Sequence, residues 1–381
     1  MATTVTAPVS NSIALAQRFL PLLDEVYAAE SKTAVLDLLT EYVEWIGANT
    51  VKLFNIKTGG LGNYSRNAGF VPGDTTGTWE TYTLDYERGR SFMVDVLDSD
   101  ESMGMAFGGL LSTFEREHAI PEIDSVRFAK YAAGAGIKAT PATITSSTDV
   151  AALIDAAQAE MNDAEVPEEG RICFVSNKAY NQLKKNITRY TLNGEGNVNQ
   201  NVEMYDDVRI IKVPSARFWT GVTLAAPTNS YDAGGYTSGG VQINFLLVHP
   251  SAVLQTIKHL VPRIFSPEVN QEADAYKLNY RVTGGNFVKE AKAKGIYLHA
   301  SAPATAMTIS ANTASISGTG TSTITVSNPV GTVTVESSDT GVCTVSISSS
   351  TVTITGVAAG SATVTIADGI GQVKTVAVTV S

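Results

Sequence analysis

The sequence is short of the residues that most catalytic and metal-binding chemistry uses. Its 381 residues include two cysteines, Cys173 and Cys343, and four histidines. Neither cysteine lies in a metal-type spacing or beside a histidine, and no HExxH motif occurs. The sequence therefore predicts neither a disulfide framework nor a zinc site, and it offers no obvious Cys–His nucleophile.

Long apolar runs and an excess of positive charge are also missing. No stretch approaches the roughly 20 apolar residues that cross a bilayer, and no basic region followed by an apolar run opens the chain. The formal net charge of -10 opposes binding to a phosphate backbone, because like charges repel. We therefore expect a protein made in a cytoplasm, with no membrane partner and no sequence-specific contact to nucleic acid.

Two short motifs resemble ligand sites without meeting their requirements. Residues 95–101 form an acidic run that lacks the glycine and the terminal glutamate of a calcium loop. Residues 134–139 fit the loosest dinucleotide-binding pattern, but they follow a predicted helix where a strand is needed. We expect a strand end in the first case and a linker in the second, and hence no cofactor, no metal site and no enzyme.

The composition changes sharply near residue 300. Residues 301–381, called the tail below, contain only four charged side chains, whereas β-branched residues alternate along them with a period of two. The alternating segments are residues 324–326, 333–335, 352–354, 364–366 and 376–380. Composition alone would permit a flexible Ser/Thr-rich stalk, but the alternation favours short strands in a small β-sandwich.

Helical patterns open the first 300 residues. An apolar stripe predicts a helix over residues 34–46, which ends before Gly47. A second and longer helix, the spine, is expected over residues 99–133 with a bend at Pro121, because proline cannot continue the hydrogen-bond ladder. The apolar side of each helix must be buried against other elements, so we expect a packed α+β body.

An α/β pattern follows the spine. The sequence predicts a helix over residues 150–161, a buried strand over residues 171–175, and a further helix with Ser176 as its N-cap. Further strands are expected at residues 208–213, 241–248, 276–282, 286–288 and 295–299, with loops at residues 191–200 and 226–240. This order predicts a mixed sheet with an inserted subdomain.

A glycine-studded polar ribbon, residues 51–103, connects the two N-terminal helical patterns. Compact domains rarely carry such a long connection without a use for it. Two extended arms of about 15 residues each would reach about 50 Å at roughly 3.3 Å per residue. Arms of that length predict a neighbouring molecule on which they lie.

Short motifs occur in a definite order along residues 10–300. They include Asn63-Tyr-Ser-Arg66, Gly69-Phe-Val-Pro-Gly-Asp74, Trp79-Glu-Thr81, Glu87-Arg-Gly-Arg90, Glu115-Arg116, Ile120-Pro-Glu-Ile-Asp124, Val213-Pro-Ser-Ala-Arg-Phe218, Leu247-Val-His-Pro-Ser-Ala252 and Gly295-Ile-Tyr-Leu-His299. In this order they resemble the major capsid proteins of tailed bacteriophages with the Hong Kong 97 fold. One departure is Glu87, where the family pattern has an aspartate.

The resemblance implies an α+β fold divided into the parts of that family. These are an N-terminal helical arm at 1–55, an extended loop at 56–92, the spine helix and peripheral domain at 93–142, an axial domain at 143–262, peripheral return strands at 263–300, and the tail at 301–381. It implies a subunit that assembles through pentameric and hexameric capsomers into an icosahedral shell around double-stranded phage DNA.

The implied partners are the chain itself, a portal and a separate scaffolding protein. Helical patterns begin within the first dozen residues, so we expect no long helical prodomain to serve as a built-in scaffold. The packaged DNA is expected to make no sequence-specific contact. The implied location is the virion capsid, assembled in the cytoplasm of a bacterial host.

The tail carries a resemblance of its own. Ser337-Ser-Asp339, Val345 and the segment from Thr355 to Ile366 are similar to the bacterial immunoglobulin-like group 2 module. The similarity implies an all-β immunoglobulin-like sandwich that serves adhesion, decoration or bracing. Because packed DNA fills the interior of such a shell, we expect the tail to project outward, where its many hydroxyl groups suit weak contacts with host-surface glycans or with adjacent tails. An alternative for the whole chain is a surface-layer or adhesin-type structural protein with such a binding module.

The extended loop and the spine supply the candidate assembly contacts. These are Tyr64, Arg66, Phe70, Trp79, Glu80, Arg88, Arg90, Glu115 and Glu117. Arginines of the loop can pair with acidic residues of a neighbouring subunit, including Glu80, Glu87, Glu115 and Glu117. Equally, they can brace the base of their own loop.

Overall fold

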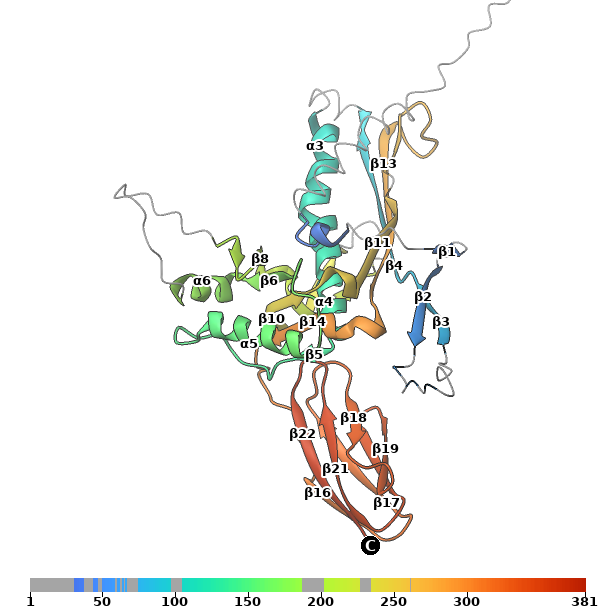
Figure 1. Cartoon of the computed structure of the whole chain (residues 1–381). Helices are drawn as coiled ribbons and strands as arrows, with labels where there is room; N and C mark the ends of the chain where they lie inside the picture. Colours follow the sequence, from blue (N-terminus) through green and yellow to red (C-terminus); the bar gives the residue numbers. More distant parts are fainter. Residues whose placement is uncertain are drawn as a thin grey trace, which may run out of the picture. The chain divides into compact units, whose positions relative to one another are not determined.

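The computed structural model describes residues 31–37, 44–46, 50–58, 60–61, 64, 66, 75–96, 105–186, 202–226, 234–260 and 262–381 (Figure 1). The chain forms two compact units. The first unit consists of Met1–Glu117 with Leu254–Phe287, and the second of His118–Val253 with Val288–Ser381.

A three-stranded antiparallel sheet lies in the first unit, in the order β1-β2-β3. Its strands are β1 (Glu44–Ile46), β2 (Thr50–Thr58) and β3 (Thr75–Thr83). The β2 and β3 strands pair along their whole length, from Thr50 opposite Thr83 to Thr58 opposite Thr75. This pairing confirms two paired arms, of nine residues each and about 30 Å long at 3.3 Å per residue. The length of about 15 residues and about 50 Å stays a prediction, because most of residues 59–74 lie outside the described residues.

The helix predicted over residues 34–46 is wrong at its C-terminal end. Residues 34–37 form a short 3-10 turn, and Glu44–Ile46 is a strand that pairs with β2. The apolar stripe did not predict the backbone conformation, because an available strand edge overrides a weak helix propensity. The buried apolar residue of this segment is Leu36, which lies outside the predicted stripe. Residues 38–43 lie outside the described residues, and so do Leu38, Leu39 and Tyr42 of the predicted stripe.

A second sheet of the first unit contains two long strands, β4 (Tyr86–Asp95) and β13 (Ala275–Val288). They pair antiparallel from Tyr86 opposite Gly284 to Asp95 opposite Ala275. Strands β11 (Val253–Leu260) and β12 (Arg263–Phe265) lie on the other side of β13. The two strands predicted over residues 276–282 and 286–288 are thus one strand, which continues through Gly284 and Gly285.

Helical structure extends without interruption from residue 105 to residue 134. It comprises α3 (Met105–Phe114), the π-helical turn η2 (Glu115–Ala119) and α4 (Ile120–Gly134). The π turn lies directly before Pro121, where the missing N–H and the ring prevent an ordinary α-helical hydrogen bond. The predicted spine helix is confirmed from residue 105 onward, and its irregularity lies at Glu115–Ala119, just before Pro121. Residues 99–104 of the prediction lie outside the described residues.

The second unit contains a mixed sheet in the order β5-β14-β10-β6-β8-β7, with β9 paired to β10. Its strands are β5 (Ile137–Lys138), β6 (Ile172–Ser176), β7 (Met204–Tyr205), β8 (Val208–Val213), β9 (Trp219–Leu224), β10 (Tyr236–Val248) and β14 (Ile296–Ala300). The strands predicted at residues 171–175, 208–213 and 295–299 are confirmed to within one residue at each boundary. The strand predicted at residues 241–248 is also confirmed, but it begins earlier, at Tyr236.

Helices cover both faces of this sheet. On one face, α5 (Val150–Asp163) and α6 (Asn177–Asn186) lie side by side and share a core with Cys173, Val175 and Phe245 (Figure 1). On the other face, Phe128 of α4 contacts the rings of Phe174 and Phe218, at centroid distances of 5.2 and 4.9 Å. Because Cys173 and Phe174 are adjacent on β6, they point to opposite faces and both are buried.

The loop predicted over residues 226–240 is wrong for residues 236–240. These residues begin β10 and pair with β9, with Thr237 opposite Thr223 and Gly239 opposite Gly221. Glycine and serine made the segment look like a loop, but a backbone ladder needs no side chains, and a partner strand was present. Residues 191–200, the other predicted loop, lie outside the described residues.

The tail forms two four-stranded sheets, β15-β17-β20-β19 and β16-β22-β21-β18. The strands are β15 (Thr308–Ile309), β16 (Thr313–Ile316), β17 (Thr321–Ser327), β18 (Thr334–Ser337), β19 (Cys343–Ser348), β20 (Thr351–Gly356), β21 (Gly360–Ala367) and β22 (Val373–Val380). Alternating residues of both sheets form one buried core, which includes Ile324, Val352 and Val376. The predicted sandwich is confirmed, and the flexible stalk is not.

Candidate assembly surface

Among the described residues, contacts at one end of the β2–β3 pair anchor it to its own unit. Val51 and Leu84 pack with Leu254 in a small buried cluster, with Phe287 against it. The ring of Tyr82 lies 4.9 Å from the ring of Phe287. On the part of β3 that precedes Tyr82, the residues Thr76, Gly77, Trp79 and Thr81 are exposed, and Glu80 is half-buried.

Large apolar side chains of this pair and its connecting loop face solvent. Trp79 is 53% exposed, Tyr64 is 61% exposed, and Leu61 is fully exposed. Trp79 lies opposite Phe54 in the strand register, so the exposed ring is held on a regular backbone. Burial of a large apolar side chain contributes about 2 kcal/mol, so exposed residues of this kind are candidates for contact with another molecule.

The two arginines of β4 lie on the inner side of that strand. Along β4, Glu87, Gly89, Ser91 and Met93 are exposed, whereas Arg88 and Arg90 alternate with them and are half-buried. The same side carries Phe92, whose ring lies 4.8 Å from that of Phe114. This placement favours bracing of their own unit over a contact with a neighbour.

The acidic residues named as possible partners differ in their surroundings. Glu80 accepts a hydrogen bond from the Tyr82 hydroxyl at 2.6 Å, and Glu87 forms an ion pair with Arg281 of β13. Glu115 is 0% exposed in a single copy, so a contact with a neighbour's arginine would need this turn to rearrange, and its role in assembly stays a prediction. The π turn that contains Glu115 directs it inward and leaves Glu117 exposed.

The remaining candidates are only partly placed. Arg66 is exposed in the loop between β2 and β3. Phe70 lies outside the described residues. The sequence analysis missed Leu61 and Met93, which is 53% exposed on β4. The period-two alternation of β4 could have identified Met93, since it shares a side with Glu87 and Ser91.

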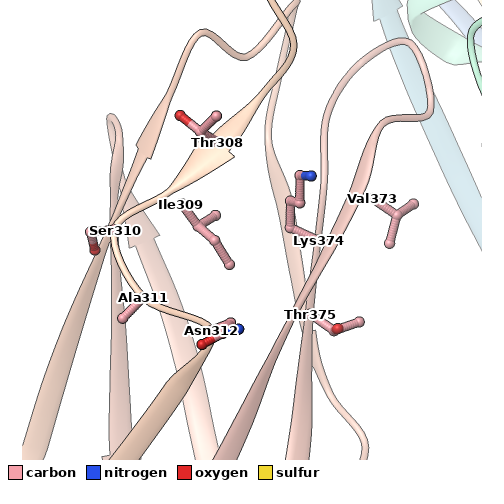
Figure 2. A pocket seen from close by; sticks show the side chains of 8 residues that line it. All are labelled: Thr308, Ile309, Ser310, Ala311, Asn312, Val373, Lys374 and Thr375. Carbon is pink, nitrogen blue, oxygen red and sulfur yellow. The ribbon is translucent and has the colours of Figure 1, made fainter.

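A hollow in the tail is the other distinctive surface. The first strand of the tail changes sheets, because β15 pairs with β17 whereas β16 pairs with β22. Val373–Thr375 is left without a partner on the β16 side, in a tail that the structure describes throughout. Figure 2 shows the pocket of about 540 Å³ in this gap, which is lined by Thr308, Ile309, Ser310, Ala311, Asn312, Val373, Lys374 and Thr375.

The described residues offer little that resembles a catalytic centre. Both cysteines are buried, and burial raises the pKa of the Cys173 thiol, so that it stays protonated at neutral pH. His249 and His299 have pKa values lowered mainly by burial. Within the described ranges, no group of three or more His, Cys, Asp or Glu side chains is arranged to hold a metal ion.

No helix among the described residues is long and apolar enough to cross a bilayer. No protein-family model matches the chain. No curated protein matches it either.

Solved phage structures are similar to part of the chain. The mature capsid of bacteriophage PhiM1 is 14% identical over 68% of this chain and 83% of its own, with a TM-score of 0.48. The capsid of cyanophage P-SCSP1u is 13% identical over 68% and 85%, with a TM-score of 0.46. The structure of Mycobacterium phage Che8 is 16% identical over 69% and 94%, with a TM-score of 0.43. The likeness is partial and of low identity.

Proposed function

We propose that this chain is a major capsid protein, the repeating subunit of an icosahedral phage shell. The observation that carries the proposal is the β2–β3 pair, which is anchored at one end and exposes Leu61, Tyr64 and Trp79 along the rest. A second copy that covers these side chains would supply the burial that a single copy lacks. The ordered motifs of the first 300 residues support the same assignment.

Assembly in this proposal is cooperative because each subunit takes part in several contacts. Contacts between unlike faces repeat around a rotation axis and close into rings. We propose pentameric and hexameric rings that join into a closed shell around double-stranded DNA. Several modest contacts for each subunit make the finished particle resistant to dissociation, while a wrongly placed subunit can still leave during growth.

The partners follow from the same proposal. The shell would join a portal at one vertex, form on a separate scaffolding protein, and enclose DNA without sequence-specific contacts. The net charge of -10 supports the last point, because a strongly acidic wall repels packed DNA. The virion capsid is the proposed location, and the host cytoplasm the place of assembly.

We propose that the tail is an immunoglobulin-like sandwich that projects outward and forms weak, repeated contacts. Tryptophan, tyrosine and arginine dominate tight protein interfaces, and the tail contains none of the three. Its pocket offers hydroxyl groups, the Asn312 amide and the Lys374 ammonium. Such groups suit bracing between neighbouring tails or weak adhesion to host glycans, and the many copies on a shell multiply a weak affinity.

A surface-layer or adhesin-type protein is the second candidate, since the sandwich tail is compatible with it. It would form flat sheets or remain a monomer, whereas a capsid subunit forms closed particles. The test is negative-stain electron microscopy of the full chain, expressed alone and with a candidate scaffolding protein. Closed shells, tubes or rings support the capsid proposal; flat two-dimensional arrays or dispersed monomers would contradict it.

A further inference from the structure

Two neighbouring helices of the second unit carry opposite charges on their outer sides. Helices α5 and α6 lie side by side on one face of the mixed sheet (Figure 1). The acidic face comprises Asp155, Glu160 and Asp163 of α5; the basic face comprises Lys178, Lys184 and Lys185 of α6. All six side chains are exposed except Lys184, which is half-exposed.

The buried stripe of each helix directs these charges outward. In α5, Val150, Ile154, Ala157 and Met161 are buried, and at about 100° per residue the three acids fall on another side. In α6, Ala179, Tyr180 and Leu183 are buried and leave the lysines on the outer side. Packing of the core therefore fixes where both charged faces point.

The two charges are segregated along the chain as well. Residues 139–170 contain seven acidic residues and no basic one, whereas residues 171–186 contain four basic residues and no acidic one. Around α5, the Tyr205 hydroxyl donates to Asp155 at 2.9 Å. Burial together with Asp155 raises the pKa of Tyr205 to about 12, as expected beside a concentration of negative charge.

Positive charge is concentrated around α6 in the same way. The ammonium groups of Lys184 and Lys212 lie 5.3 and 4.8 Å from the centre of the Tyr180 ring. The ring is held in place, because the Tyr180 hydroxyl accepts a hydrogen bond from the backbone N–H of Val202 at 2.7 Å. A ring face attracts cations, and here it gathers two of them on one side of the domain.

Neither face is neutralised within one copy by an ion pair that the structure shows. The ion pairs that the structure shows for Arg217, Lys277 and Arg281 involve none of the six side chains of the acidic and basic faces. One molecule thus presents two complementary surfaces.

We propose that the acidic face of one copy binds the basic face of the next copy. This inference rests on the proposed shell function and names a contact within it. A contact between unlike faces that repeats about a rotation axis closes a ring, as the proposed shell requires. Opposite charges would set the register of neighbours and speed their association, while burial of the β2–β3 pair would supply most of the affinity.

A second copy fits the basic face better than nucleic acid does. The lysines lie beside a helix with three exposed acids, on a chain of net charge -10. A duplex that reached the lysines would also approach those acids, and phosphate contacts would be opposed. The acidic face of another copy meets no such opposition.

Charge reversal on each face, and on both together, tests the proposal. The basic-face variant is Lys178→Glu with Lys185→Glu, the acidic-face variant is Glu160→Lys with Asp163→Lys, and the third variant combines all four. Each single-face variant should raise the concentration needed for assembly at least about tenfold, because like charges then meet. The combined variant should return within about threefold of the unmodified chain, because opposite charges meet again.

A matched control separates the contact from net charge. Lys292→Glu with Lys294→Glu makes the same change in charge as the basic-face variant, at exposed positions of η5 (Glu290–Gly295) outside both helices, and should leave assembly unchanged. Assembly is measured by sedimentation and negative-stain microscopy, with far-ultraviolet circular dichroism and thermal melting to show that each variant folds. Raised salt should weaken assembly of the unmodified chain and reduce the differences between the variants.

Three results would overturn the inference alone. The first is normal assembly of both single-face variants. The second is a pair of single-face variants that fold but do not assemble, and whose assembly the combined reversal does not restore. The third is a basic-face variant that assembles normally but no longer binds duplex DNA. The last result would assign the lysines to DNA. Absence of any assembly by the unmodified chain, even with a scaffolding protein, would instead overturn the proposed function on which the inference rests.

Discussion

At the scale of single residues, buried polar groups hold the second unit together. Asp124 of α4 is fully buried, and Arg217 donates to its carboxylate at 3.2 Å. Asp368 in the tail is also buried, and its two oxygens accept hydrogen bonds from Val330, Ile370 and Gln372. Each carboxylate thereby joins its own segment to a residue far away in the sequence, Arg217 in the first case and Val330 in the second.

Replacement of Asp124 by alanine should destabilise the protein by about 3–5 kcal/mol, since the Arg217 guanidinium would lose its buried partner. The control is Arg209→Ala, which removes an exposed arginine of β8 and should cost less than about 0.5 kcal/mol. Urea unfolding followed by circular dichroism measures both. Equal stability of the two variants would show that the pair contributes little.

Asp368→Ala should destabilise the tail by about 3 kcal/mol, because the backbone N–H groups of Val330, Ile370 and Gln372 would lose their acceptor. Asp339→Ala is the matched control; the Asp339 carboxylate accepts one bond, from Gly341 at 2.8 Å, and its loss should cost about 1 kcal/mol. Hydrogen exchange of tail peptides in the full chain provides the measurement. Similar exchange rates in both variants would contradict the prediction.

His299 predicts a loss of stability in mild acid. It is buried, lies 4.9 Å from the Phe245 ring and contacts the Asn244 amide at 3.0 Å. Burial lowers the pKa of His299, so below about pH 6.5 the unfolded chain binds more protons than the folded protein. Stability should therefore fall as the pH falls from about 7 to 5.

The pH dependence of the melting temperature tests this expectation. It should be shallower in His299→Gln than in the unmodified protein. An identical slope in both proteins would mean that His299 does not cause the acid sensitivity.

At the scale of elements, sequence periodicity predicted those helices and strands whose burial follows one period. Helix α5 and the tail strands have clear apolar patterns, and the structure confirms them. The predictions failed where a partner strand decides the conformation, as in Glu44–Ile46 and at residues 236–240. No local pattern reports a partner that lies elsewhere in the chain.

The candidate surface was predictable to a similar extent. The glycine-rich ribbon and its aromatic residues identified Tyr64 and Trp79 as surface candidates, and both are exposed. The ion pair of Glu87 with Arg281 joins residues 194 positions apart, and the burial of Glu115 depends on a π turn. Neither fact could be derived from local spacing.

At the scale of the whole molecule, the tail should be dispensable for assembly. It has a core of its own, built from its two sheets, and nearly all charged residues lie before it. A chain truncated after Ala300 should therefore assemble with less than about a twofold loss in yield, as measured by sedimentation of particles. Circular dichroism checks that the truncated chain folds. A folded truncated chain that builds no particles would show that the tail is part of the shell.

A substitution at Trp79 tests assembly independently of folding. Trp79→Ser removes a ring that is 53% exposed in a single copy, so the free energy of unfolding should fall by only about 1 kcal/mol, the contribution of its buried part. Assembly should fall about tenfold or more, because the ring would be buried only against a neighbour. Tyr82→Ala is the contrasting variant and should lower stability, because that ring packs on Phe287 of its own unit.

The most direct test of the account is intermolecular cross-linking at position 79. A photoreactive residue replaces Trp79 in the full chain, unlabelled and nitrogen-15-labelled proteins are mixed before assembly, and cross-linked peptides are read by mass spectrometry. The account predicts abundant cross-links between light and heavy chains in the assembled fraction. Cross-links confined to single chains, in a protein that stays monomeric with or without a scaffolding protein, would contradict it.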